Sequence, residues 1–202
     1  MSLEKIITSL KIKGINGLAV TDHNTIIGAL KLKKIAPPSL TVIVGEEIAT
    51  REGEVTGLFL TEKIPPKLTP EETIFRIKSQ GGLVLIPHPF DCLRRLRIKS
   101  EALLRIIDQV DIIEAFNSRN FFKKDDYKAK KLAESKGIAI CAGSDAHSLY
   151  ELGRSYLEIK KFHSPEEFLE NLYNARLITK KSGVWAHFLT VKNKYIQKKF
   201  FP

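Results

Sequence analysis

The chain has 202 residues, of which 43% are hydrophobic and 28% are charged. This balance predicts one globular domain with a substantial core and argues against a disordered or fibrous protein. No apolar run reaches the ~20 residues that a membrane span requires, and the first five residues lack the apolar stretch of a secretory signal. We therefore expect a protein with no membrane association.

The formal net charge of +10 favours anionic partners, either phosphorylated small molecules or nucleic acid. A Lys-, Ile- and Glu-rich composition also fits the surface of a thermophilic protein. The chain has only two cysteines, Cys92 and Cys141, and Cys141 lies in a buried-strand pattern. We therefore expect no disulfide framework and a cytoplasmic location.

The first half of the chain alternates helical and strand patterns. Thr69 and Glu72 form a capping-box signature with Pro70 between them, which predicts the start of a helix. The Glu52-Gly53 pair predicts a turn between two strands. The predicted elements are, in order, a helix over 3–13, a strand over 17–20, a helix to about residue 34, strands over 40–44 and 55–60, and a helix from 70 to 80.

The second half continues the alternation. Gly137 predicts the end of one helix, and Ser164-Pro165 predicts the start of the last clear one. Alternating strands and helices are typical of parallel β/α architecture. The predicted elements are strands over 83–86 and 111–116, helices over 100–107 and 124–136, strands from 138 and over 156–159, and a helix from 165.

Polar side chains that can bind metal follow most of the predicted strands. In β/α barrels the loops after the strands converge on one face, where the chemistry takes place. Alone, Asp145 fits a helix cap and His147 a surface histidine equally well. If the strand from residue 138 stays extended, both side chains point the same way and form half of a divalent metal site. The repetition of the pattern at several strand ends favours the metal site: Asp22, His23, Glu47, His88, Asn117, Asp145 and His147.

These motifs resemble the PHP (polymerase and histidinol phosphatase) family of metal-dependent phosphoesterases. The resemblance covers about residues 3–175, and it implies a distorted (β/α)7 TIM-like barrel with up to three divalent ions of the Mn, Zn or Fe type. The segments that carry it are Thr21-Asp22-His23-Asn24-Thr25, Gly45-Glu46-Glu47-Ile48, His88-Pro89-Phe90-Asp91, Ile113-Glu114-Ala115-Phe116-Asn117 and Gly143-Ser144-Asp145-Ala146-His147.

The resemblance also implies roles for individual residues. Asp22 is expected to orient a ligand or a water. Arg119, and less strongly Arg94, are candidates to bind phosphate, although each also fits an ordinary solvated arginine. Glu114 and Asn117 lie where some relatives have a further ligand. The expected metal ligands are His23, Glu47, His88, Asp145 and His147.

The sequence departs from the family pattern at its start. The family's first motif, His-x-His at the end of a first strand, has no counterpart here, since no histidine precedes His23. Three interpretations follow: an N-terminal segment is missing from this sequence, the protein is a degenerate relative, or a partner chain completes the barrel. We favour the first, because the later motifs are intact. The edge left without its first strand favours pairing with another chain, so a homo-oligomer is an alternative to a monomer.

The predicted protein is thus one domain over residues 1–202, with a basic C-terminal extension over about 180–202. Its predicted function is hydrolysis of a phosphate ester of a small metabolite or nucleotide by metal-activated water. The alternative is a weakly active or non-catalytic module that binds nucleic acid within a processing complex. In the extension, we expect the apolar side chains from Trp185 onward to cover the barrel or a neighbouring subunit while the lysines face water. The alternative is a tail that binds nucleic acid.

The departure from the pattern gives a testable prediction. With one or two ions held instead of three, metal binding should be weak and phosphatase turnover should be ~100-fold or more below that of a chain extended to restore His-x-His, since each ~1.4 kcal/mol is tenfold in rate. Turnover of p-nitrophenyl phosphate by both chains with Mn and with Zn measures this. Equal rates would show that the motif does not matter.

Overall fold

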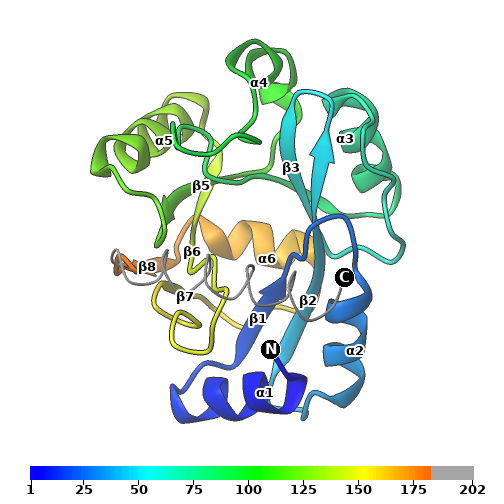
Figure 1. Cartoon of the computed structure of the whole chain (residues 1–202), viewed down its shortest axis with the longest axis vertical. Helices are drawn as coiled ribbons and strands as arrows, with labels where there is room; N and C mark the ends of the chain where they lie inside the picture. The colour runs from blue at the N-terminus through cyan, green and yellow to red at the C-terminus, as the bar shows by residue number, and fades with distance from the viewer. Residues whose placement is uncertain (183–202) are drawn as a thin grey trace, which may run out of the picture.

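The computed structural model describes residues 1–182 and contains a six-stranded sheet curled into a half-barrel, with helices packed on its outer side (Figure 1). Neighbouring strands in the sheet follow one another in the chain, in the order β1 to β6. The strands are β1 (Gly17–Val20), β2 (Thr41–Thr50), β3 (Gly53–Leu58), β4 (Leu83–Ile86), β5 (Ile112–Asn117) and β6 (Ala139–Gly143). This is the distorted, TIM-like fold that the motifs predicted.

The helices begin and end close to where their capping signals predicted. Thr69 and Glu72 complete the predicted capping box, and Gly137 ends its helix with a left-handed φ of 64°. The helices are α1 (Leu3–Ile12), α2 (Ile27–Ile35), α3 (Pro70–Ser79), α4 (Ser100–Ile106), α5 (Lys123–Lys136) and α6 (Pro165–Leu172), and α4 continues into a 3-10 turn over Ile107–Gln109. Strand β7 (Tyr156–Glu158) was predicted and pairs antiparallel with β8 (Arg176–Ile178). The sequence patterns did not predict β8.

The expectation of a purely parallel sheet is wrong for β3. It runs antiparallel to both β2 and β4, whereas the pairs β1–β2, β4–β5 and β5–β6 are parallel. The physical reason is the short connection: only Arg51 and Glu52 separate β2 from β3, and a parallel crossover needs a dozen or more residues. Strand β2 also extends to Thr50, well past the predicted end at residue 44, and the two strands form a long hairpin.

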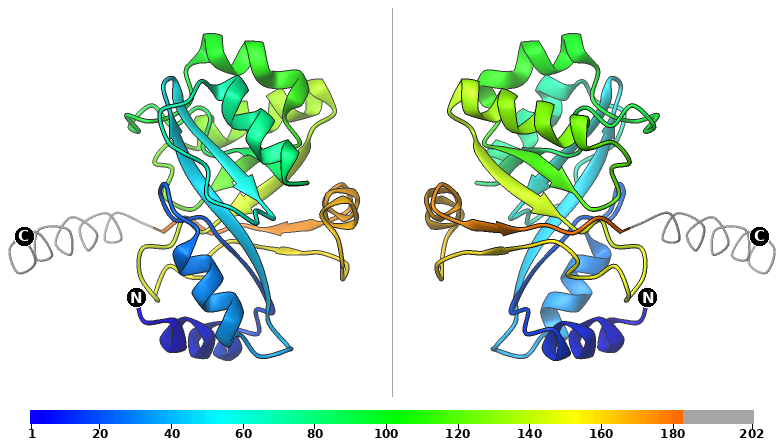
Figure 2. Two further views of the ribbon diagram at one scale, coloured as in Figure 1. Left: turned by 90° about the vertical axis from the view of Figure 1, so that its right-hand side faces the viewer. Right: turned by 90° about the vertical axis from the view of Figure 1, so that its left-hand side faces the viewer.

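The inner face of the curled sheet is apolar at one end. Phe168 and Leu172 of α6 pack there against the strands, and α6 crosses behind the sheet in Figure 1 and lies to one side of it in Figure 2. We call this layer the apolar floor. It contains Ile43, Leu58, Leu83, Ile112, Ala139 and Cys141, which come from the amino ends of parallel strands and from the carboxyl end of antiparallel β3.

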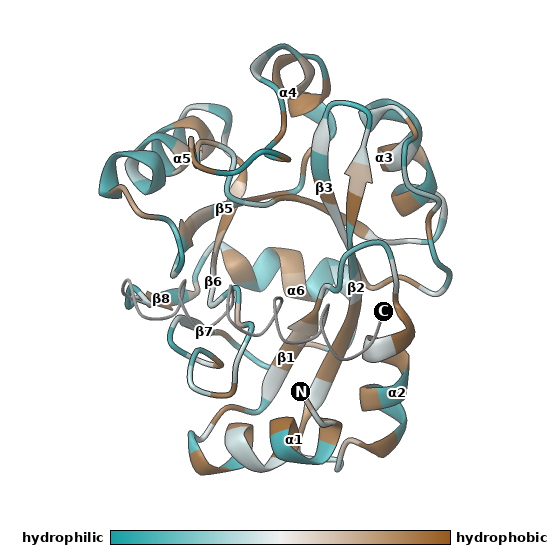
Figure 3. Ribbon diagram, in the orientation of Figure 1, coloured by the Kyte–Doolittle hydropathy of each residue, from teal (hydrophilic) through white to brown (hydrophobic). Residues whose placement is uncertain are grey.

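The outer face of the sheet packs against α3, α4 and α5. Alternate residues of the same strands, among them Val44, Ile48 and Ile86, form this second core with apolar side chains of the helices. Figure 3 shows the corresponding division of the helices, with apolar stretches toward the sheet and polar stretches outward. Among the described residues, no helix has the length and hydropathy to cross a membrane. The prediction for residues 185–202 lies outside the described part of the chain.

The close contact of β2 with β3 gives a prediction about stability. A Cβ atom on Gly45 would lie 2.8 Å from the carbonyl oxygen of Gly57 and 2.9 Å from Cγ2 of Thr21, whereas one on Gly17 meets nothing within 4 Å. Gly45→Ala should therefore lower the free energy of unfolding by roughly 1–3 kcal/mol, as overpacking does. Gly17→Ala is the control and should leave it nearly unchanged. Urea denaturation measures both, and equal losses would contradict the contact.

Candidate metal centre

Two carboxylates of the β2–β3 hairpin lie side by side on the inner face of the sheet. The antiparallel register pairs Glu47 with Thr56 and Ala49 with Glu54. Residues that pair directly point to the same face, so Glu47 and Glu54 are diagonal neighbours on that face. They lie beyond the apolar floor, toward the end of β2 that joins the turn. Glu54 is 3% exposed, so water can hydrate its carboxylate only poorly.

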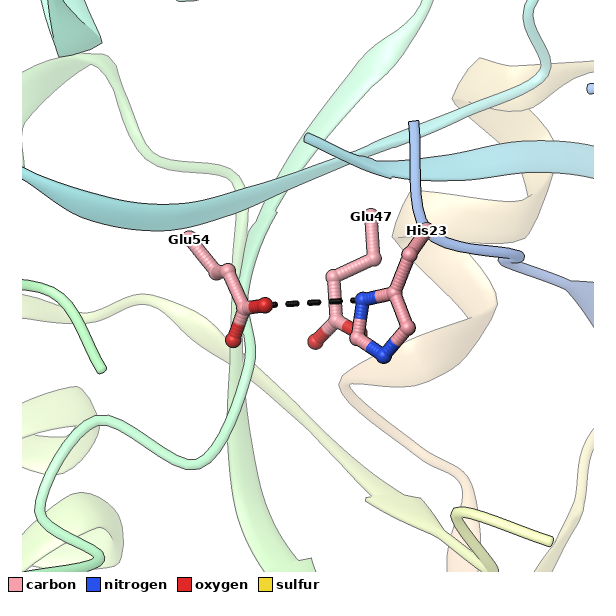
Figure 4. Close-up of side chains that lie close together, drawn as sticks. All are labelled: His23, Glu47 and Glu54. Carbon is pink, nitrogen blue, oxygen red and sulfur yellow. Dashed lines mark ion pairs between the residues drawn. The ribbon is translucent and has the colours of Figure 1, made fainter. Parts of the chain in front are cut away.

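His23 reaches this pair from the segment that follows β1. The segment continues the pairing of β1 with β2, because His23 forms a parallel bridge with Glu47. Asn24, with a positive φ of 55°, holds it in place: its backbone N–H donates to the Glu47 carbonyl at 3.0 Å, and its Oδ1 accepts from the Ala49 N–H at 2.9 Å. Nδ1 of His23 lies 3.0 Å from Glu47 Oε2 and 3.5 Å from Glu54 Oε1 (Figure 4).

His88 approaches from the opposite side, directly after β4. Its Nε2 lies 3.0 Å from Glu47 Oε1 and 3.9 Å from Glu54 Oε2, and its side chain is 2% exposed. The residue has a φ of 30°, a strained value for a non-glycine residue, and its backbone N–H donates to Glu114 Oε2 at 2.7 Å. We call His23, Glu47, Glu54 and His88 the His–Glu cluster.

The electrostatics of the His–Glu cluster reflect two acids held together out of water. Burial, and then the charge of Glu47, raise the pKa of Glu54 to about 6. Burial alone would lower the pKa of His88, but its hydrogen bond with Glu47 and the charge of Glu114 raise it on balance. The pair of carboxylates thus favours positive charge close by, either on the imidazoles or on a cation.

A second polar group adjoins the His–Glu cluster. Asn117 Nδ2 donates to Glu114 Oε2 at 3.0 Å and to Asp145 Oδ2 at 3.3 Å. The Arg94 guanidinium bonds to Asp145, and its Nε lies 3.1 Å from Asp91 Oδ2. Burial would raise the pKa of Asp145, but Arg94 outweighs this and holds it below the usual range. Arg94 is therefore an internal ion-pair partner and not an ordinary solvated arginine.

The structure brings Asp145 and His147 together, but not by the predicted extended backbone. Strand β6 ends at Gly143, and Asp145 has a φ of 47°, in the left-handed region that Asp tolerates. The turn folds His147 back, so that its Nδ1 lies 3.0 Å from the Asp145 carbonyl oxygen and 3.5 Å from its Oδ1. The prediction of a continued strand is wrong because the chain leaves the extended conformation at Asp145, and the backbone N–H of His147 donates to Glu151 instead.

The two remaining predicted residues occupy supporting positions. The Asp22 carboxylate lies against α2, where a Cβ on Gly28 would be 2.2 Å from its Oδ2, and the Asp22 carbonyl accepts from the Glu47 N–H at 3.2 Å. Arg119 is buried, and its Nε lies 3.8 Å from Glu151 Oε1. Oε2 of Glu151 accepts from the backbone N–H of His147 at 3.1 Å, so Arg119 connects to the Asp145–His147 turn.

Glu54 is the site residue that the sequence analysis missed. It precedes the predicted strand over 55–60, and the predicted parallel architecture placed candidate ligands only after strands. In an antiparallel hairpin the first residues of the second strand lie at the same edge as the last residues of the first. The two-residue Arg51-Glu52 connection was the signal that would have predicted Glu54 beside Glu47.

The His–Glu cluster fits a divalent cation. Atoms of His23, Glu47 and Glu54 that can bind metal all lie within 4.8 Å of one another. Nδ1 of His88 is buried and has no hydrogen-bond partner among the described residues. Imidazole nitrogens and carboxylate oxygens together suit Mn, Fe and Zn, and Mg prefers an all-oxygen set.

Comparison with known proteins agrees with this geometry. Residues 125–177 match the PHP-associated family (PHP_C). Two uncharacterized proteins of Methanocaldococcus jannaschii are similar in sequence: MJ0417 is 38% identical over 164 residues, which are 76% of this chain and 65% of the relative, and MJ1587 is 45% identical over 115 residues, which are 56% and 64%. The chain thus spans less than two thirds of the length of these curated relatives.

Several solved structures share the fold. A two-domain protein of Bacteroides vulgatus that contains a predicted PHP-like metal-dependent phosphoesterase has a TM-score of 0.66 at 16% identity, covering 87% of this chain and 60% of that one. PsfC of Pseudomonas syringae has a TM-score of 0.64 at 16% identity, covering 98% and 89%. Endonuclease Q in complex with duplex DNA has a TM-score of 0.57 at 19% identity, covering 86% of this chain and 52% of that one. Residues 125–177 thus match the PHP-associated family, and the chain shares the fold of these structures.

Replacing Glu54 tests the electrostatics of the His–Glu cluster. Because folding raises its pKa from 4.5 to about 6, the native chain holds the extra proton, and its stability falls as the pH rises through that window. In EDTA, Glu54→Gln should therefore raise the free energy of unfolding above pH 6 by roughly 1–2 kcal/mol. The same change removes a charged oxygen and should lower the affinity for Mn²⁺ at least ~10-fold.

Glu46→Gln is the matched control. Glu46 is a fully buried neighbour whose pKa burial also raises, but it points to the outer face, where its Oε2 accepts from the Ile64 N–H at 2.9 Å. The Glu46→Gln substitution should leave the affinity for Mn²⁺ unchanged. Denaturation across pH and calorimetric titration with Mn²⁺ measure the two effects, and equal loss of affinity in both variants would contradict the assignment.

Proposed function

We propose that the protein is a metal-dependent phosphoesterase that hydrolyses a phosphate ester with activated water. The observation that carries this proposal is the His–Glu cluster: two adjacent carboxylates between two imidazoles, on the inner face of a PHP-type barrel. Two neighbouring carboxylates, one buried and one largely so, repel each other unless a positive charge lies close by. Such a pair with a raised pKa is typical of a functional site.

The residues proposed to hold metal are those of the His–Glu cluster, with Asp145 and His147 as candidates for a further ion. Divalent ions bound there would lower the pKa of a bound water and offset the charge that develops on the phosphate oxygens. Glu114 and Asn117 keep Asp145 and the His88 backbone in place through their hydrogen bonds. The donor set favours Mn, Zn or Fe.

Arg94 is proposed to contribute a positive charge to the same space. It contacts the carboxylates of Asp91 and Asp145. Burial would lower its pKa, but the charge of Asp145, and then those of Glu114 and Glu47, raise it above its ordinary value. If Asp145 served as a metal ligand, the Arg94 guanidinium would be available to bind a phosphate oxygen. Arg119 is proposed to position His147 through Glu151. Asp22 is proposed to hold the backbone of Glu47 in place, because its carbonyl accepts from the Glu47 N–H.

The substrate is proposed to be a phosphate monoester or diester of a metabolite, a nucleotide or a nucleic acid. The net charge of +10 favours any of these anions. Endonuclease Q, which shares the fold, has been captured with an abasic lesion of duplex DNA at its active site. A binding module without turnover is the second candidate, and the absence of any phosphatase activity under metal would favour it.

Replacing His88 tests the proposed function. His88→Ala removes an imidazole that contacts both carboxylates, and it should lower the turnover of p-nitrophenyl phosphate with Mn²⁺ ~100-fold or more, since each ~1.4 kcal/mol is tenfold in rate. EDTA should abolish turnover by the unchanged chain, and added Mn²⁺ should restore it. The metal content after gel filtration should fall in the variant.

His163→Ala is the matched control, because His163 is exposed and follows β7, away from the His–Glu cluster. It should keep both metal content and turnover. If the unchanged chain hydrolyses no phosphate ester with Mn²⁺, Zn²⁺ or Fe²⁺, or if His88→Ala keeps full activity, the proposed function is wrong.

A further inference from the structure

The loop after β5 and the first turns of α5 expose three aromatic rings among lysines. Phe121 is 58% exposed, Phe122 36% and Tyr127 62%, which is unusual for large apolar side chains so close together. We call this region the aromatic–lysine surface. It contains Phe121, Phe122, Lys123, Lys124, Tyr127 and Lys128.

The outward face of α5 is cationic because its first-turn acids turn inward. Asp125 and Asp126 are buried, at 3% and 8% exposure. Asp126 accepts from Asn120 Nδ2 at 2.8 Å and pairs with Lys181. Negative side chains at a helix start would otherwise offset nearby lysines. Their burial leaves the lysines of the aromatic–lysine surface without carboxylates in the first turn to neutralise them.

The rings and ammonium groups are arranged side by side. The Phe121 and Phe122 centroids are 5.0 Å apart with the ring planes at 78°, and Lys124 Nζ lies 4.9 Å from the Phe122 centroid. Lys131 Nζ lies 5.8 Å from the Tyr127 centroid. Lys124 and Lys128 are four residues apart, so they share one side of the helix. The surface thus combines exposed aromatic rings with ammonium groups that lie over two of them.

This surface adjoins the proposed active site along the chain. Asn117, which ends β5, bonds to both Glu114 and Asp145, and Phe121 follows after three residues. Ser118 N–H donates to the Gly143 carbonyl at 2.9 Å, and Asn120 N–H donates to the Asn117 carbonyl at 3.2 Å. The segment between the site and the exposed rings is therefore short and fixed by hydrogen bonds. Figure 1 shows α5 beside β5.

We infer that the aromatic–lysine surface binds single-stranded nucleic acid and guides one of its phosphodiesters to the His–Glu cluster. The inference rests on the proposed function and names its substrate class. Exposed rings stack on unpaired bases of any sequence, and lysines beside them neutralise the backbone phosphates. Paired bases in a duplex do not offer their faces, so single strands are the preferred ligand.

Charge argues against two other occupants of the surface. A second copy of the chain would bring a net charge of +10 toward a cationic face. The segment of this chain beyond residue 182 has its own lysines at positions 192, 194, 198 and 199, so it also carries the wrong sign. A polyanion with flat apolar groups complements both the charge and the rings.

The test compares binding and turnover in the full chain. Fluorescence anisotropy with labelled 20-nucleotide single-stranded DNA and RNA, in EDTA, measures binding, and the matching duplexes measure preference. Phe121→Ala combined with Phe122→Ala should weaken single-strand binding at least ~10-fold, because base stacking on one ring is worth ~1–3 kcal/mol. Lys124→Ala combined with Lys128→Ala should reduce the slope of log affinity against log salt by ~0.7 for each lysine.

Matched controls use side chains of the same kind elsewhere on the molecule. Phe75 on α3 is 72% exposed, and Lys5 and Lys11 are exposed on α1. Phe75→Ala, and Lys5→Ala combined with Lys11→Ala, should leave single-strand affinity within twofold. All of these variants should keep the Mn²⁺-dependent turnover of p-nitrophenyl phosphate, because none of the residues belongs to the proposed metal site.

Three results would overturn the inference and leave the proposed function intact. The first is turnover of p-nitrophenyl phosphate with no single-strand binding, or with binding that the Phe121 and Phe122 changes do not affect. The second is tighter binding to duplex or to vesicles of anionic phospholipid than to single strands. The third is a dimer in sedimentation velocity that these changes dissociate. If the unchanged chain hydrolysed no phosphate ester with Mn²⁺, Zn²⁺ or Fe²⁺ but still bound single strands, the proposed function would be refuted instead.

Discussion

The antiparallel contact between β2 and β3 sets the character of the whole site. It places Glu47 and Glu54 next to each other on an inward face, where neither can be fully hydrated. Two like charges at this separation repel, and the raised pKa of Glu54 records that repulsion together with burial. His23 and His88 flank the pair, and Arg94 lies nearby, so positive charge on these side chains would offset the repulsion. A fold that keeps such a pair must gain from it elsewhere, and binding a divalent ion is the simplest gain.

The inner face of the sheet has two layers, an apolar one that stabilises the fold and a polar one that holds the like-charged pair. The apolar floor, closed by Phe168 and Leu172 of α6, supplies burial at the amino ends of the strands and holds the sheet in its curled form. Beyond the floor, every strand end contributes polar atoms, and the backbone leaves the regular conformation with positive φ at Asn24, His88 and Asp145. Asn and Asp tolerate this region, but His88 is strained there, and its buried position and the hydrogen bond of its N–H to Glu114 hold it in place.

Much of the architecture followed from the sequence because its signals are local. The capping box at Thr69 and the glycine at position 137 fixed helix ends, and the polar residues after the strands located most of the site. Strand direction was not local: a pattern of apolar residues is the same for either direction, so β3 was assigned to the wrong one and Glu54 was missed. The turn at Asp145 was also missed, because its geometry depends on the contact of Glu151 with His147, which only the folded chain brings together.

The segment from Asn117 to Phe122 joins chemistry inside the barrel to recognition outside it. Asn117 is buried and bonds to two carboxylates of the site, whereas Phe121 is largely exposed. Asp126 ties this segment to α5 by accepting from Asn120 Nδ2. A polymer bound on the rings would therefore be held at a constant distance from the metal-binding residues, and the entropy cost of placing its phosphate would be met at the binding step.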